Sequence, residues 1–268
     1  MTLYSTVGAS GASTPLRIFV AYAAGAAAAE VAGLAGGAFA ATIGYGALLL
    51  VLAAHAAMSV VKTGPLATVP AAAPFIAVGV PAMLRFSTLT LEGSPSAVVR
   101  HYGVVGIPAF LALTTAWVSF PELRPRRVPQ VDRTTVFIAA WGLPVGLLFA
   151  PAFTRASLVP EHGRWRSVVL VVVILVAAAI IEELLFRGVV QTSLREFVGP
   201  YAPLVGTAAL IPAYLNVRPV GFVFVALFTG CATALAVELV GAIRGVILAR
   251  IVFLVGLVVF WPRVLGLP

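Results

Sequence analysis

RSVVLVVVILVAAAIIEELLFRGVVQTSLRE, residues 166–196, is the stretch that decides the fold of this chain. Its uncharged part runs from Ser167 to Ile181, and two adjacent carboxylates, Glu182 and Glu183, follow directly. Because apolar residues continue beyond these acids, we expect the charges to lie at membrane depth or just below a membrane surface. An ionisable group there is costly, so it predicts a functional site and a partner of opposite charge.

Arg187 is the partner that the spacing predicts for one of the two acids. On an α-helix, Glu183 and Arg187 are four residues apart and share a face. Glu182 lies about 100° further round the helix and is left outside that pair. One carboxylate held by a cation beside a second one is an arrangement suited to general-base chemistry.

The composition of the chain indicates a membrane protein. Of its 268 residues, 61% are hydrophobic and 10% are charged, which is not the balance of a soluble domain. The formal net charge is +8, but 16 of the 17 basic residues are arginines scattered between apolar stretches, as topology signals are. The partner that this pattern predicts is therefore the lipid bilayer and not nucleic acid. The single cysteine, Cys231, excludes a disulfide within the chain and is typical of packing.

Apolar segments separated by short polar stretches predict an all-α, polytopic helical membrane bundle of about nine spans. We expect the spans at residues 16–36, 38–61, 66–86, 97–120, 134–153, 167–190, 201–216, 219–239 and 241–261. The charged, proline-rich stretch 121–133 separates an accessory region of about four spans, residues 1–133, from a core at residues 134–268. Basic residues assigned to the two sides of the predicted bundle, Arg85 among them, divide eight against seven, which leaves the orientation open.

Three further polar residues fall within predicted spans. We expect Glu30 to face a polar bundle interior or a helix end, with a second buried acid site as the alternative. His55 is expected to bond to a neighbour rather than to bind a metal. Glu238 is either buried or caps its helix before Gly241. The sequence has no HExxH pattern, no P-loop and no glycine-rich dinucleotide turn, so no metal or cofactor is predicted.

The run EELLFRG, Glu182 to Gly188, resembles the EExxxR motif of the CPBP family. This family, also called Abi, contains the CAAX prenyl-protein proteases and bacteriocin-processing enzymes. The resemblance covers roughly residues 165–265 and implies an intramembrane endopeptidase in which Glu182 activates the hydrolytic water. It implies that Glu183 and Arg187 orient that base. The substrate would be a peptide or a membrane-protein tail, and the protein would be a multi-pass protein of a prokaryotic plasma membrane.

The second and third motifs of the family, FxxxH and HxxxN, are substituted here. The segments GTAALIPAYLNV (206–217) and GAIRGVILARIVFLVG (241–256) take their places. Asn216 and Arg250 then stand where the family has histidine, and Leu254 stands for the asparagine. All histidines of the chain precede the EExxxR run: His55, His101 and His162.

The substitutions leave two hypotheses open. In the first, Asn216 holds a water or an oxyanion through its amide and Arg250 stabilises an oxyanion, which gives an active endopeptidase. In the second, Arg250 pairs with Glu182 and weakens it as a base, which gives a catalytically degenerate pseudoenzyme. Such a protein would bind a membrane partner without catalysis, in immunity, sensing or as a scaffold. Both hypotheses use the same candidate site residues: Glu182, Glu183, Arg187, Asn216 and Arg250.

Overall fold

The computed structural model is helical throughout the residues that it describes, which are 13–63, 69–89, 97–123, 133–153, 165–215, 220–241 and 243–265. No strand occurs in these ranges. Five helical stretches within them are long and apolar enough to cross a membrane: Thr14–Val61, Ala71–Leu89, Arg133–Ala150, Val168–Ala208 and Ile243–Phe260. The predicted all-α membrane bundle is confirmed at this level, whereas the count of nine spans is not confirmed.

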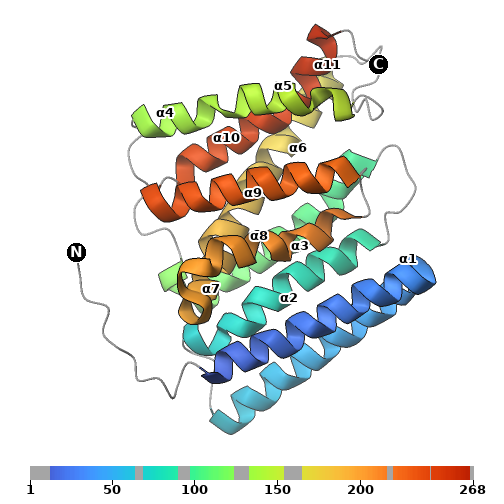
Figure 1. Ribbon diagram of the computed structural model, residues 1–268, viewed down its shortest axis with the longest axis vertical. Helices are drawn as coiled ribbons and strands as arrows, with labels where there is room; N and C mark the ends of the chain where they lie inside the picture. Colours follow the sequence, from blue (N-terminus) through green and yellow to red (C-terminus); the bar gives the residue numbers. More distant parts are fainter. Residues whose placement is uncertain are drawn as a thin grey trace.

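Helix α1 (Ser13–Thr63) is a helical hairpin. Figure 1 shows its two arms running antiparallel, and the chain reverses at Gly37, where φ is 74° and ψ is −171°. This backbone conformation is essentially restricted to glycine. The arms pack closely, since a methyl group added to Gly44 would lie 2.8 Å from the Cβ atom of Ala29. The expected segments 16–36 and 38–61 therefore meet where the sequence placed their boundary.

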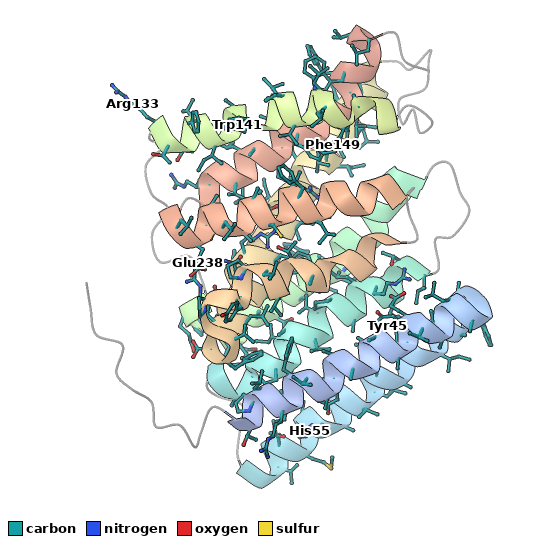
Figure 2. The ribbon with its side chains drawn as sticks, in the orientation of Figure 1. Tyr45, His55, Arg133, Trp141, Phe149 and Glu238 are labelled. Atoms are coloured by element: carbon teal, nitrogen blue, oxygen red, sulfur yellow. The ribbon has the colours of Figure 1, made fainter. Side chains whose placement is uncertain are left out.

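Two polar contacts lie inside this N-terminal layer. The Glu30 carboxylate accepts hydrogen bonds from Arg85 Nε at 2.6 Å and from the Tyr45 hydroxyl at 2.8 Å, so it faces a polar bundle interior as predicted. The sequence interpretation of Arg85 as a topology charge on one side of the membrane is wrong, because this residue is only 2% exposed and pairs with Glu30 inside the bundle. The His55 Nδ1 atom lies 2.6 Å from the Tyr22 hydroxyl, as expected of a histidine bonded to a neighbour (Figure 2).

The remaining helices stack on this hairpin. They are α2 (Val69–Leu89), α3 (Ala97–Ser119), η1 (Pro121–Leu123), α4 (Arg133–Ala140), α5 (Gly142–Phe153), α6 (Trp165–Glu183), η2 (Leu184–Val190), α7 (Gln191–Val198), η3 (Gly199–Tyr201), α8 (Ala202–Leu215), α9 (Val220–Val240), α10 (Ile243–Val255), η4 (Gly256–Phe260) and α11 (Trp261–Val264). In Figure 1 the α1 hairpin lies at one end of the bundle and α4–α5 at the other, with α2, α8 and α9 between them. With 14 residues, α8 rises only about 21 Å, which is less than the roughly 30 Å of a hydrocarbon core.

The EExxxR run leaves α-helical geometry, which the sequence did not predict. Helix α6 ends at Glu183 and continues as the π-helical turn η2, in which the backbone N–H of Gln191 bonds to the carbonyl of Phe186, five residues earlier. Such π-helical turns within helices are frequent at functional sites.

The main hydrophobic core surrounds this turn. Buried side chains from many helices form it, α3, α6 and η2 among them, and include Leu113, Leu175, Leu185 and Val189. Leu254, which the sequence alignment placed at the third-motif asparagine, belongs to this core and is 1% exposed. The two acids therefore lie at the edge of a densely packed apolar centre.

Candidate functional site

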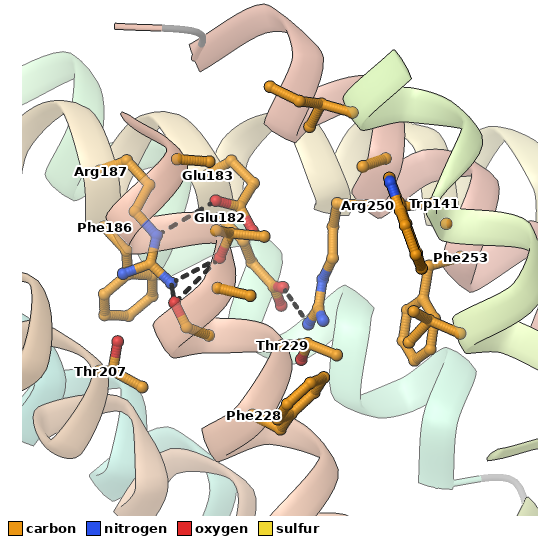
Figure 3. A pocket seen from close by; sticks show the side chains of 18 residues that line it. Trp141, Glu182, Glu183, Phe186, Arg187, Thr207, Phe228, Thr229, Arg250 and Phe253 are labelled. Carbon is orange, nitrogen blue, oxygen red and sulfur yellow. Dashed lines mark hydrogen bonds and ion pairs between the residues drawn. The ribbon is translucent and has the colours of Figure 1, made fainter. Parts of the chain in front are cut away.

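A cavity of about 260 Å³ brings most of the predicted site residues together. It lies among α4–α5, the end of α6, η2, α8, α9 and α10. The charged side chains on its wall, among the residues described, are Glu182, Glu183, Arg187 and Arg250 (Figure 3). Asn216 lies outside the described residues, so its place in the site stays a prediction.

The first ion pair joins the end of α6 to the π-helical turn. Arg187 Nε lies 3.4 Å from Glu183 Oε2, and both side chains are buried. Arg187 also donates through Nη2 to the Gly230 carbonyl at 2.9 Å and to Thr233 Oγ1 at 3.1 Å. The pairing predicted from the i, i+4 spacing is thus present, and its guanidinium is fastened to α9 as well.

Gly230 is the reason that α8, α9 and Arg187 can meet so closely. A methyl group added to Gly230 would lie 2.8 Å from Thr207 Cγ2 and 3.6 Å from Arg187 Nη2. Contacts under 3.0 Å force neighbouring atoms to shift, so a larger residue would separate α9 from α8 or displace the arginine. The glycine therefore keeps its own carbonyl within reach of the guanidinium.

The second ion pair joins α6 to α10 across the cavity. Arg250 Nη2 lies 3.3 Å from Glu182 Oε2, and both side chains are largely buried. The guanidinium carbon is 5.7 Å from the centre of the Phe253 ring, a distance typical of a cation–π contact. In Figure 3 the guanidinium lies between the Glu182 carboxylate and the aromatic side of the cavity, formed by Trp141 and Phe253. The acid that the sequence predicts as the base is thus engaged by Arg250, the residue that the sequence analysis placed at a motif histidine.

A third polar contact lies beyond the cavity, between α7 and α9. The Glu238 carboxylate accepts hydrogen bonds from both Nε and Nη2 of Arg195, and the distance to Nε is 2.9 Å. It also accepts one from Gln191 Nε2 at 3.2 Å. Glu238 is partly exposed, so the expectation that it is fully buried is not met (Figure 2). This contact holds α9 against α7 next to the Arg187 site.

Sequence reasoning overlooked the contribution of α9 and of Thr207 on α8. Thr207, Thr229, Gly230 and Thr233 line the cavity, and two of them hold Arg187. The signal available was the spacing of Thr229 and Thr233 around a glycine, but hydroxyl and small residues are common in membrane helices that pack together. Among the described residues, no group of three or more His, Cys, Asp or Glu side chains is placed to hold a metal.

Ion pairs of this kind, enclosed in an apolar helical bundle, define an integral membrane protein with a buried polar site. Residues 164–255 match the model of a family described as type II CAAX prenyl endopeptidase, Rce1-like. The match includes the EExxxR run and Arg250, and it confirms the predicted resemblance to the CPBP family over these residues. No curated protein and no solved structure matches the chain.

Proposed function

We propose that this CAAX-protease-like membrane protein binds a peptide or the tail of a membrane protein in its cavity without hydrolysing it. The observation that supports this proposal is the ion pair between Arg250 and Glu182, 3.3 Å long. A general base must offer a carboxylate oxygen to the water that it activates. Here the guanidinium engages an oxygen of that carboxylate and competes with the water for it.

The absence of a histidine after residue 162 supports the same proposal. A hydrolase must also return a proton to the leaving amine. No histidine follows His162 in the chain, and an arginine keeps its proton and cannot act as that relay. The cavity retains the walls of a binding site, with aromatic, hydroxyl and charged side chains around a volume large enough for part of a peptide.

An active endopeptidase is the second candidate. Arg250 lines the cavity, so its donors could stabilise an oxyanion in place of a histidine, and Asn216 would be the second donor. In that case the pair with Glu182 would have to open when substrate binds, and the contact of 3.3 Å between Arg250 Nη2 and Glu182 Oε2 is long enough to permit this. A bidentate charge-assisted pair at roughly 2.7–2.9 Å would oppose such opening more strongly.

We further propose residues 134–268 as the functional core and residues 1–133 as an accessory region, in a bundle of about nine spans in a prokaryotic plasma membrane. The family match lies wholly within the proposed core, which supports the division. Both regions contribute to one hydrophobic core, with Leu84 and Leu113 on one side and Leu175 and Leu257 on the other. The division is therefore one of function and not of independent packing.

The proposal is tested with purified protein in lipid and a panel of prenylated and unprenylated peptides. Cleavage is followed by mass spectrometry, and binding by fluorescence anisotropy of labelled peptides. We expect binding, with no more cleavage product from the wild type than from Glu182→Gln, which keeps the shape of the side chain and removes the base. Cleavage by the wild type that Glu182→Gln abolishes would establish the endopeptidase instead.

A further inference from the structure

The exposed side chains that line the cavity are apolar and come from α9 and from the start of α5, and we take them to mark its mouth. Trp141, where α4 meets α5, is 56% exposed, and Phe228 of α9 is 65% exposed, yet both line the cavity. Ala232 of α9 also lines the cavity and is exposed. In a helical membrane protein, exposed apolar side chains of this kind face hydrocarbon rather than water.

We infer that the cavity admits an uncharged, apolar polypeptide segment sideways from the bilayer, between α5 and α9. This inference rests on the proposed function and names the class of ligand and its route. The mouth supports the route, because a segment that is already in the membrane reaches the cavity without crossing water.

The charges on the cavity wall support an uncharged ligand. Among the described residues, two carboxylates, Glu182 and Glu183, face two guanidinium groups, Arg187 and Arg250, and the charges pair. A short peptide with a free carboxylate would leave water for a cavity with no surplus positive charge, and the lost hydration would not be replaced. An apolar segment arriving from lipid has no such hydration to lose.

The polar floor of the cavity favours a polypeptide, rather than a lipid chain, as the ligand. Below the apolar mouth, the wall carries the two ion pairs and the hydroxyl side chains of Thr207 and Thr229. Within a membrane, backbone N–H and C=O groups released from a helix must find partners in protein. A polypeptide segment that opens locally can place such groups on this floor, whereas a hydrocarbon chain has nothing to pair with it.

The test places a photoreactive amino acid at Phe228 or at Trp141 in the full chain, reconstituted in lipid bilayers. The control position is Leu34 on α1, which is 89% exposed and far along the chain from the cavity. The ligands are a tagged apolar transmembrane peptide with blocked ends and a tagged, prenylated short peptide with a free carboxylate. We expect the transmembrane peptide to cross-link about tenfold more at Phe228 and Trp141 than at Leu34, a ratio that corresponds to about 1.4 kcal/mol of preference. Unlabelled transmembrane peptide should compete and the prenylated peptide should not.

Equal cross-linking at Leu34 would show mere proximity in the bilayer and would overturn the inference. So would preferential capture of the prenylated peptide, or capture of lipid alone. The route is tested separately by Ala232→Trp, which fills the mouth, against Leu235→Trp, which adds the same bulk to an exposed residue of α9 that does not line the cavity. We expect only Ala232→Trp to reduce cross-linking at Trp141 to the level of Leu34.

The outcomes separate this inference from the proposed function. Cleavage that depends on Glu182 would overturn the non-hydrolytic proposal while leaving the lateral route intact. Binding of the prenylated peptide alone, without cleavage, would keep the proposed function and overturn this inference. Should Ala232→Trp fail to fold, the cross-linking yields at Phe228 and at Leu34 in otherwise unaltered protein still decide whether the apolar segment binds at the cavity.

Discussion

Arg250 and Glu182, 68 residues apart in the chain, meet at 3.3 Å on the wall of a largely apolar cavity. The pair ties α10 to α6 at the acid that the EExxxR run predicts as the base. A second pair, between Glu183 and Arg187, lies beside it and is fastened to α9. Because both pairs are buried, each residue influences the packing of the bundle as well as the chemistry of the cavity.

Arg187→Ala should destabilise the folded protein strongly. The change leaves Glu183 as a buried charge and removes two hydrogen bonds to α9, and breaking a buried pair typically costs roughly 3–5 kcal/mol. The matched control is Arg133→Ala, because Arg133 is exposed and projects from the bundle at the start of α4 (Figure 2). Thermal unfolding in detergent should show a much lower Tm for the first variant only. Equal Tm values for both would argue against a structural role for the pair.

Gly230→Ala should destabilise the bundle by overpacking. The added methyl group would lie 2.8 Å from Thr207 Cγ2, and overpacking of this kind typically costs about 1–3 kcal/mol. Gly106→Ala on α3 is the control, since a methyl group there meets no atom within 4 Å. We expect the Tm to fall for Gly230→Ala and to stay or rise for Gly106→Ala. A Gly230→Ala variant as stable as its control would show that α9 moves away from α8 without cost.

Gly37→Ala tests the backbone conformation at the reversal of the α1 hairpin, because the substitution introduces backbone strain and no steric clash. Neither Gly37 nor Gly79 would bring an added methyl group within 4 Å of another atom, but only Gly37 has a positive φ, of 74°. Holding a non-glycine residue in that region costs on the order of 1–3 kcal/mol. Gly37→Ala should therefore lower the Tm, while Gly79→Ala should leave it unchanged or raise it slightly. If the two variants unfold together, the reversal is not held in the conformation described.

Features set by neighbours in the chain could be predicted from the sequence. The boundary between residues 16–36 and 38–61 follows from apolar segments flanking Gly37, and the Glu183–Arg187 pair follows from a spacing of four. In both cases the interacting groups are separated by a few residues, so local helix geometry is enough to bring them together.

Features set by packing between distant helices could not be predicted in this way. Arg187 reaches the Gly230 carbonyl across 43 residues, and Arg85 meets Glu30 across 55. In the sequence, a charge whose partner is that remote looks like a topology charge at one side of the membrane, which explains the error over Arg85. The π-helical turn η2 likewise depends on the packing of its buried side chains and has no local sequence signature.

The pair between Glu182 and Arg250 supplies the last prediction, which concerns the recovery of activity. Replacing Arg250 by histidine removes the permanent charge beside the candidate base and adds a group that can relay a proton. We choose Asn216→His together with Arg250→His, and leave Leu254 unchanged. Leu254 lies in the hydrophobic core, where an asparagine would bury an amide without a designed partner.

The wild type, the double variant and the same two proteins carrying Glu182→Gln are compared in lipid with the peptide panel. Because positioned acid–base groups typically contribute about 10²–10⁴-fold to rate, we expect the double variant to cleave at least about 10²-fold faster than its Glu182→Gln control. The wild type should not differ from its own control. All four proteins must first show similar Tm values, so that a loss of fold is not mistaken for a loss of catalytic activity. If the wild type cleaves and the double variant does not, Arg250 takes part in hydrolysis as a stabiliser of the oxyanion, and its contact with Glu182 is a resting arrangement that substrate displaces.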